Sequence, residues 1–401
     1  MNNHSLLALA SLLWCLLPAK AQTAVSPLEA FLADIEAHNP QLLASHDANQ
    51  AILAERRADN RPGQTSVEYS PFYQSGYQGV ASSELIVQQE FDFPTLYAAR
   101  NRSNTAMQQV LDAQYRTLRR DILLQAVGTL YDLCEARQTQ SLYARRLAAS
   151  DSLLLAYQRQ LAQGDATLLD VNRIRMDQMA VRTEALRCES RIQELVRELV
   201  HLNGNHPLSS DIAQAADPLV LTAGTIIAND AVAMYHANPS QEVQLADAAL
   251  QLSKRELSEA RQSWLPQLTM GYRRNTERDE ALNGFIVGVS LPLFSNKGKV
   301  KAAQLRNQAA DYELLEAMTA DEMRTQTLQS QSQQLRLILE AYDEPLMQQQ
   351  LALLSKAVLA GELTVADFYT EADRVYTLLL ERYRTHNEYL KLLAQIHRDA
   401  L

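Results

Sequence analysis

The sequence predicts a mainly α-helical protein made of two tandem structural repeats, each of which carries one β-hairpin. Only 12 glycines and 12 prolines occur in 401 residues, so long helices meet few interruptions. The pair Asn39-Pro40 recurs half a chain later as Asn238-Pro239. After each pair, the hydrophobic period changes once from the helical value to the strand value of two. The same order of elements is therefore expected twice.

Each Asn-Pro pair has the composition of a helix start. Asn caps helix N-termini, and Pro is favoured at the first helical position because its missing N–H would have no partner there. The two pairs lie 199 residues apart, and each precedes a run rich in Ala and Gln. We expect short helices over residues 39–60 and 239–263.

The change to period two predicts hairpins over residues 64–93 and 265–293, closed by Pro94 and Pro292. These prolines lie 198 residues apart. The hydrophobic positions of the alternating segments share one face and are Leu85, Val87, Phe91, Phe93, Phe285, Val287, Val289 and Leu291. The other face carries Glu84, Gln88, Glu90, Gly288 and Ser290.

Very long helices are expected next, over residues 97–163 and 297–360. Hydrophobic residues recur there every three or four positions, and each helix would be about 100 Å long. The helices stop at Gly164 and Gly361, which lie 197 residues apart and are natural left-handed caps where the chain turns back. Pro345 inside the second helix indicates a kink or a restart at the first helical position.

A medium helix returns after each turn, over residues 167–203 and 364–400. The first repeat then covers residues 22–203 and the second covers 237–401, with a linker or equatorial segment at 204–236. Each repeat thus contains a short helix, a hairpin, a very long helix and a medium helix. The short and medium helices together are about as long as one rod, so they are expected to stack end to end beside it.

The first 21 residues have the pattern of a secretory signal peptide, with an apolar core followed by an A-K-A cleavage site. Cys15 follows Trp14 rather than a small residue, so we expect no lipid anchor. Cleavage would remove one lysine and no acidic residue, which leaves a net charge of −11. That charge argues against nucleic acid as a partner.

The hydrophobic hairpin faces have no partner among the predicted rods, so we expect them to face lipid. A sheet in a bilayer must close, because no strand edge can remain unpaired there. Four strands cannot close, whereas bacterial barrels have eight or more. Three copies would give a twelve-stranded barrel, with the polar face lining an aqueous lumen. Aromatic residues such as Tyr69, Trp264 and Tyr272 would lie at the lipid–water interfaces.

Two other function classes fit parts of the pattern. A periplasmic coiled-coil adaptor or scaffold without a transmembrane barrel would explain the long helices, but not hairpins at matched positions. An enzyme would need an active site, and the sequence has neither a Gly-rich phosphate loop nor a nucleophile elbow. The closest histidine pair, His201 and His206, lacks a Cys or acidic neighbour at metal-ligand spacing. We expect no catalytic residue, no cofactor and no metal site.

In their order and doubling, these features resemble the TolC family of outer-membrane efflux proteins. The resemblance rests on the doubled Asn-Pro, on the hairpin ends E-F-D-F-P and S-L-P-L-F, and on the turns from Gly164 and Gly361. The segments Y-D-E-P-L-M-Q-Q-Q and L-A-G-E-L-T-V-A-D-F are most similar to the heavy-metal cation branch of that family.

The resemblance implies a homotrimer with a 12-stranded β-barrel in the outer membrane of a Gram-negative bacterium and a 12-helix α-barrel in the periplasm. Such a protein is the exit duct of a tripartite efflux system. It passively conducts drugs, metal cations or other substrates from an inner-membrane pump and a periplasmic adaptor to the outside. Outer-membrane lipid would be its remaining partner.

The resemblance also implies sites at the helical turns. The family narrows its periplasmic mouth with acidic rings, whose positions fall on Asp367 and on Thr370, with Glu371 as a substitute beside it. Asp170 holds the equivalent place after the first turn. Carboxylate rings favour cations, although acidic residues in a first turn are also ordinary helix-dipole partners. An adaptor is expected to dock on the turn residues Gly164, Asp165, Gly361 and Glu362.

Overall fold

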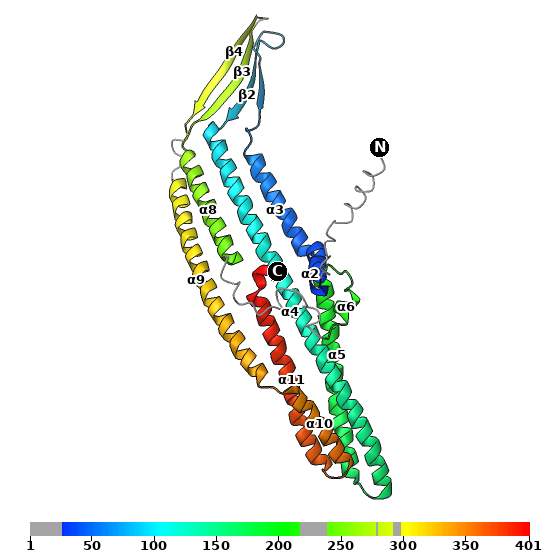
Figure 1. The fold of residues 1–401 in the computed structure, drawn as a ribbon. Coiled ribbons are helices and arrows are strands. Elements are labelled where there is room, and N and C mark those ends of the chain that lie inside the picture. Colours follow the sequence, from blue (N-terminus) through cyan, green and yellow to red (C-terminus); the bar gives the residue numbers. More distant parts are fainter. Residues whose placement is uncertain (1–25, 217–238, 278–279, 292–297) are drawn as a thin grey trace, which may run out of the picture.

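A computed structural model describes residues 26–216, 239–277, 280–291 and 298–401. The chain forms an elongated helical bundle with a small β-sheet at one end (Figure 1). The expected signal peptide lies outside the described residues, as do Asn238 and Pro292. None of the described helices combines the length and the hydrophobicity that a membrane span requires.

The expected mainly helical fold is confirmed, and the elements follow the same order in both halves. The first half contains α2 (Pro27–His38), α3 (Pro40–Asp59), β1 (Ser66–Phe72), β2 (Ser82–Phe91), α4 (Pro94–Gln163), α5 (Leu168–Leu202) and the short α6 (Ser210–Ala213). The second half contains α8 (Gln241–Gln262), β3 (Gln267–Glu277), β4 (Glu280–Ser290), α9 (Lys299–Glu340), α10 (Glu344–Leu359), α11 (Val365–Ile396) and the 3-10 turn η3 (Arg398–Ala400). The strands form one antiparallel sheet in the order β1-β2-β3-β4.

Helix α2 occupies a segment to which the sequence analysis assigned no element. Its start carries a capping box: the Ser26 hydroxyl accepts a hydrogen bond from the Glu29 amide at 3.1 Å, and the Glu29 carboxylate accepts one from the Ser26 amide at 3.2 Å. Pro27 takes the first helical position. This S-x-x-E signature is visible in the sequence and was overlooked.

Two further bounds differ from expectation. The segment expected to be a linker contains α6, where the Ser209 hydroxyl caps the first turn by accepting a hydrogen bond from the Ile212 amide at 3.5 Å. The last helix was expected to reach residue 400 but ends at Ile396. Beyond it the Ala400 amide bonds the His397 carbonyl at 2.9 Å, which is the tighter 3-10 pattern.

The second rod is divided near Pro345, where the sequence indicated a kink or a restart, so the helix expected over residues 297–360 consists of two helices. α9 ends at Glu340 and α10 begins at Glu344, because Pro345 has no N–H to donate to the carbonyl four residues earlier. Asp343 caps the new start, with its Oδ1 accepting a hydrogen bond from the Leu346 amide at 3.0 Å. By contrast, α4 continues without a break for 70 residues, or about 105 Å.

Asn39 starts α3 and also joins it end to end to α5. Its Oδ1 accepts hydrogen bonds from the Gln41 and Leu42 amides, at 3.0 and 3.2 Å, as expected of an N-cap. Its Nδ2 donates to the Leu202 carbonyl at 2.8 Å, which satisfies an acceptor that the end of α5 leaves unpaired. The two helices therefore meet beside α4 through one buried amide.

The second half has an equivalent junction, but its helix start differs from expectation. Ser240 caps α8, with its hydroxyl accepting a hydrogen bond from the Val243 amide at 3.4 Å. The start expected at residue 239 is therefore two residues early. A serine hydroxyl can accept hydrogen bonds from the same free amides as an asparagine side chain, so Ser240 can take the capping role expected of Asn238.

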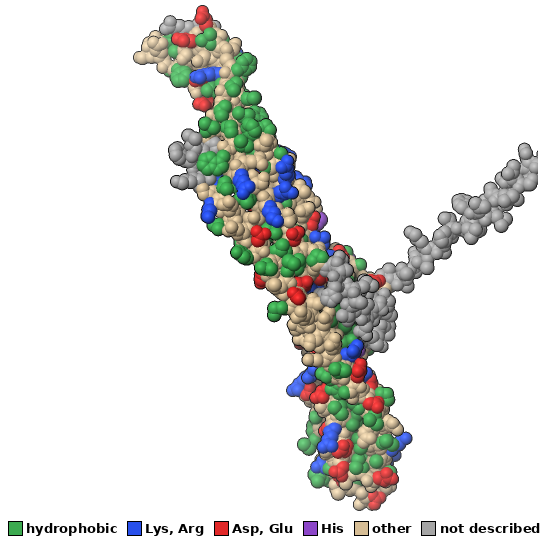
Figure 2. Space-filling view, turned by 60° about the vertical axis from the view of Figure 1, so that its left-hand side comes forward, with side chains coloured by type: hydrophobic (Ala, Val, Ile, Leu, Met, Phe, Trp, Pro, Cys, Tyr) green, Lys and Arg blue, Asp and Glu red, His purple; other side chains and the backbone are tan. Residues whose placement is uncertain are grey.

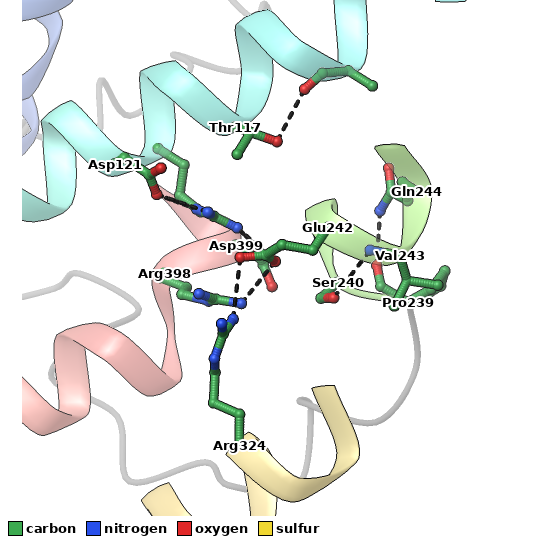
Figure 3. Close-up of polar contacts among 12 residues, drawn as sticks. Thr117, Asp121, Pro239, Ser240, Glu242, Val243, Gln244, Arg324, Arg398 and Asp399 are labelled. Atoms are coloured by element: carbon green, nitrogen blue, oxygen red, sulfur yellow. Dashed lines mark hydrogen bonds and ion pairs between the residues drawn. The ribbon is translucent and has the colours of Figure 1, made fainter. Parts of the chain in front are cut away.

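Glu242 binds three arginines at this junction (Figure 3). Its carboxylate accepts hydrogen bonds from Arg120 of α4 at 2.8 Å, Arg398 of η3 at 2.7 Å and Arg324 of α9 at 3.1 Å. Asp121 and Asp399 supply two further carboxylates to Arg120, at 2.7 and 3.2 Å. Arg120 is only 2% exposed, so these charges hold the start of α8 and the last turn of the chain against both rods.

The core follows the rods as separate clusters. The largest cluster lies at the middle, where α2, α3, α4, α5 and the end of α11 meet. Two smaller clusters lie toward the tip, between α4, α10 and α11, and one of them includes α5. The junctions of Asn39 and Glu242 thus lie beside the largest cluster.

The charges around Glu242 make the junction sensitive to acid. Burial alone would raise the pKa of Glu242, but the hydrogen bond from Arg120 and the positive charge of Arg398 lower it to about 2. A glutamate in an unfolded chain titrates near pH 4.3. Glu242 therefore stabilises the fold above about pH 4.3, and this contribution is lost as the pH falls toward 2.

We expect Glu242→Gln to lower the free energy of unfolding by about 3 kcal/mol at pH 7, because it removes the carboxylate that Arg120, Arg324 and Arg398 share. The difference from wild type should shrink as the pH falls from about 4.3 toward 2. Thermal unfolding followed by circular dichroism at several pH values measures both effects. Glu256→Gln, which removes a half-exposed partner of Arg56, is the control and should cost less than about 1 kcal/mol. Equal losses in the two variants would contradict the prediction.

Candidate functional site: the sheet and the helical tip

The strands of both halves build one continuous apolar face. Residues directly opposite in antiparallel strands share a face. Val87 pairs with Val67 on one side and with Tyr272 on the other, and Tyr272 pairs with Phe285. The register places eleven large apolar side chains on this face: Val67, Tyr69, Leu85, Val87, Phe91, Leu268, Met270, Tyr272, Phe285, Val287 and Val289.

This apolar face is largely open in the single chain. Phe285 is 90% exposed, Val287 79% and Val67 66%. The helices leave from one end of the sheet and do not lie over it (Figure 1). A hydrophobic surface of this kind marks contact with another molecule or with a membrane.

The opposite face is mainly polar. The register places all five polar-face residues expected from the sequence on it: Glu84, Gln88, Glu90, Gly288 and Ser290. Glu84 forms an ion pair across the strands with Arg273. Ile86 and Ile286 also lie on this face, so its polarity is not complete.

Two residues expected on the apolar face lie outside the strands. β2 and β4 end earlier than expected, so Phe93 and Leu291 lie beyond them, and Phe93 is the residue that precedes α4. Gln89 occupies an apolar-face position between Val87 and Phe91. Its Nε2 donates to the Gly63 carbonyl at 2.5 Å, and this bond holds the segment that enters β1.

Asp92 fixes the sheet to the helices. Its Oδ2 accepts a hydrogen bond from Arg100 of α4 at 2.6 Å, and its Oδ1 accepts one from Gln267 of β3 at 2.8 Å. Its amide donates to the Tyr97 hydroxyl at 3.1 Å. Arg100 also lies 3.7 Å from a carboxylate oxygen of Glu259 in α8. The two hairpins and two of the helices are thus tied together at one residue.

The two turns at the opposite end of the rod are glycine caps. Gly164 and Gly361 have φ angles of +86° and +76°, a region that glycine enters without strain. The amides of Asp165 and Glu362 bond back to carbonyls five residues earlier, at 2.8 and 3.0 Å. A Cβ at either glycine would meet nothing within 4 Å. Backbone conformation alone therefore requires these glycines, and the turns are open to a partner.

The acidic candidates at the tip bind the start of their own helices. The Asp367 Oδ2 accepts a hydrogen bond from the Thr364 hydroxyl at 2.6 Å, and the Asp170 Oδ2 accepts one from the Thr167 hydroxyl at 2.6 Å. Each aspartate is the third residue of its helix, so both act in capping. Asp367 remains exposed, which leaves its charge at the surface.

The other two candidates lie further along α11. Thr370 is exposed, and its hydroxyl donates to the Ala366 carbonyl at 2.9 Å. The Glu371 carboxylate accepts a hydrogen bond from Arg374 at 3.2 Å. Asp367 and Glu371 are four residues apart and lie on one face of the helix.

A charged cluster that the sequence analysis missed ties α11 to the first half. Arg146 of α4 donates to the carboxylates of Asp177 in α5 and Asp373 in α11, the latter at 2.6 Å. Its guanidinium lies 4.6 Å from the ring centre of Tyr376. Burial raises the pKa of Asp177, and the charge of Arg146 opposes that rise. Arg146 is therefore the nearest counter-charge of this buried carboxylate.

No local spacing predicts this cluster. Arg146 lies 31 residues from Asp177 and 227 residues from Asp373, so only the packed bundle brings them together. The sequence feature that could have pointed to this cluster is the position of Arg146 within a hydrophobic stretch of α4. In the described residues, no group of three or more His, Cys, Asp or Glu side chains is placed to hold a metal ion.

We expect Arg146→Met to loosen α11 at the tip, because it leaves Asp177 buried without a counter-charge. The free energy of unfolding should fall by about 3 kcal/mol. Amide hydrogen exchange should increase in residues 365–380. The added substitution Asp177→Asn should restore much of the loss, since it removes the unpaired charge. Arg145→Met, at the exposed neighbouring position, is the control. Unchanged exchange in Arg146→Met would show that Arg146 does not hold α11 to the first half.

Solved structures of bacterial membrane proteins match almost the whole chain. A structure of CusC, determined to follow folding and transmembrane channel formation, has a TM-score of 0.73 and 14% identity, covering 92% of this chain and 91% of that one. A membrane protein from Pseudomonas aeruginosa has a TM-score of 0.71 and 17% identity, covering 93% and 90%. The outer membrane protein VceC of Vibrio cholerae has a TM-score of 0.67 and 17% identity, covering 92% and 95%.

No protein-family model and no curated protein matches the chain. The structural neighbours are TolC-family outer-membrane efflux channels. At these levels of sequence identity the match shows the fold, and it agrees with the resemblance drawn from the doubled sequence landmarks. The chain has the fold of the TolC-family outer-membrane channels.

Proposed function

We propose that the chain is the outer-membrane exit duct of a tripartite efflux system, which substrates cross passively from an inner-membrane pump and a periplasmic adaptor. The observation that carries this proposal is the open sheet at one end of the rod. Its apolar face is exposed, and in the described residues β1 and β4 each pair on one side only. The fold shared with outer-membrane channels supports the same assignment.

Closure of this sheet requires further copies of the chain. A bilayer leaves no backbone group unpaired, and bacterial barrels have at least eight strands. β2 has 10 residues and β3 and β4 have 11 each, which suits the roughly 9–11 residues of a tilted membrane strand. A homotrimer would provide twelve strands, with the polar face of each sheet turned toward the lumen.

The helices also carry hydrophobic side chains that are exposed in one chain. Leu305 and Tyr312 in α9, and Leu346 and Leu353 in α10, are spaced by seven residues, as in helix-to-helix seams. Exposed apolar residues on α5 face away from the core and are Leu168, Leu169, Met176, Met179 and Leu186. In a trimer, neighbouring copies would bury both sets and complete a twelve-helix barrel.

The main alternative is a periplasmic adaptor or scaffold without a transmembrane barrel. It would use the rods but would leave the apolar face of the sheet without a role. A duct needs no catalytic group, and its energy would come from the partner pump. The structural neighbours are channels, which favours this non-enzymatic function.

At the helical tip, we assign adaptor docking to the exposed turns at Gly164-Asp165 and Gly361-Glu362. Asp367, with Glu371 and Asp170 near it, would form acidic rings in the trimer and favour cations. From the similarity to the heavy-metal cation branch we predict that the transported substrate is a metal cation.

Insertion of the sheet can be tested with two adjacent residues that face opposite sides. Val287→Arg places a charge on the proposed lipid face, at a cost of about 2–4 kcal/mol near the bilayer midplane, whereas Ile286→Arg places it on the lumen side. We expect Val287→Arg to abolish the heat-resistant trimer and the urea-resistant membrane fraction. Ile286→Arg should retain both.

The mass of the detergent-solubilised wild-type complex gives an independent check. A trimer agrees with the barrel, whereas a stable monomer would leave two bare strand edges in lipid. Equal behaviour of the two arginine variants, or release of the wild-type protein by salt alone, would favour the scaffold.

The acidic ring has a separate test at Asp367. Asp367→Asn removes the charge but retains an oxygen that can accept the Thr364 hydrogen bond, so the helix cap is kept. We expect a lower cation-to-anion permeability ratio in planar bilayers, with the trimer unchanged. Asp367→Glu keeps the charge and is the control. An unchanged ratio in Asp367→Asn would show that Asp367 acts only as a cap.

A further inference from the structure

The helix ends next to the sheet are strongly basic. Within about three helical turns of the sheet, residues 49–61, 94–105, 252–263 and 299–310 contain eleven Lys and Arg and four Asp and Glu. These segments thus carry a net charge of +7, in a chain whose total is −10. The positive charge is concentrated at one level of the rod.

Side-chain contacts show that the four helix ends lie side by side. Asn104 of α4 donates to the Arg56 carbonyl of α3 at 3.2 Å, and the Arg56 side chain lies 3.6 Å from Glu256 of α8. Asn307 of α9 donates to the Ser253 hydroxyl of α8 at 2.9 Å. The basic residues of all four segments therefore surround the rod just beneath the sheet.

Most of these basic groups have no acidic partner. Arg56 and Arg100 form ion pairs within the chain. The other nine are exposed and form no ion pair with any of the described residues: Arg57, Arg61, Arg102, Lys254, Arg255, Arg261, Lys299, Lys301 and Arg306. We call these nine residues the basic belt. Uncompensated charge at this density requires an anionic partner or remains solvated.

We propose that the basic belt binds the headgroups of anionic phospholipids in the leaflet that faces the helices. Figure 2 shows basic side chains on the helices next to the hydrophobic side chains at the base of the sheet. Trp264, between α8 and β3, is 48% exposed at the same boundary, where aromatic residues favour the membrane–water interface. The proposal rests on insertion of the sheet into a membrane.

The position of the belt matches the geometry of a headgroup layer. Three helical turns span about 16 Å, and charges within about one Debye length of a lipid surface interact with it strongly. Flexible Lys and Arg side chains can reach phosphate groups while the apolar face above them contacts the acyl chains. A homotrimer would present the belt three times around one barrel. The attraction should weaken as salt increases.

The test compares lipids retained by the full-length trimer, purified from vesicles with equal amounts of phosphatidylglycerol and phosphatidylethanolamine. Native mass spectrometry gives the ratio of the two bound lipids. We expect the wild-type protein to enrich phosphatidylglycerol. The triple variant Arg261→Gln, Lys299→Gln and Lys301→Gln should lower that enrichment by about tenfold or more. High salt during vesicle incubation should have the same effect.

The control removes the same charge far from the sheet, with Arg173→Gln, Arg175→Gln and Arg182→Gln on exposed positions of α5. It should bind lipid like the wild type. Equal enrichment in the belt variant and the wild type would overturn the proposal, as would binding of the belt to purified peptidoglycan sacculi instead of vesicles. Extraction of the wild-type protein from the vesicles by salt or urea would contradict the proposed duct function. If the wild-type protein stays inserted and the belt variant binds the same lipids, only the proposal for the basic belt is contradicted.

Discussion

The rod depends on two junctions at which shorter helices meet end to end beside a long helix. A helix of 70 residues needs neighbours along its whole length, and the chain supplies them by stacking shorter helices. Every such stack leaves unpaired backbone groups and helix dipoles at its midpoint. In the first half the amide of Asn39 satisfies backbone groups of both helices, whereas in the second half Ser240 caps α8 and ion pairs of Glu242 join α8 to the end of the chain. The two halves therefore meet the same requirement by different chemistry.

The properties of the rod change in order along its axis. The sheet offers an apolar face, the adjoining helix ends are basic, the middle contains the largest core, and the far tip consists of glycine turns and acidic caps. Asp92 connects the first two zones, and Arg146 connects the halves in the last. The two ends of the rod therefore differ in both hydrophobicity and charge.

The order of helices and hairpins could be predicted from the sequence because the same landmarks occur in both halves. Within the strands, the two-residue period predicted which side chains share a sheet face, since successive residues of a strand point to opposite faces. The exact ends of helices were harder to predict. The cap of α8 is Ser240 and not the expected Asn238, and α11 is followed by a 3-10 turn. The Arg146 cluster was beyond reach, because its members come together only after α4, α5 and α11 pack. The sequence placed Asp367 and Asp170 in the first turns of their helices, but it did not predict the hydrogen bonds that they accept there.

The interruption between α9 and α10 gives the two halves unequal stiffness. A load applied to the tip spreads over the unbroken hydrogen-bond ladder of α4, which resists bending at every turn. In the other half, the amides of Ala341 and Tyr342 bond to carbonyls three residues earlier, so the α-helical ladder is interrupted between Glu340 and Glu344. Because α11 runs unbroken past this point and packs against both α9 and α10, it carries such a load across the interruption.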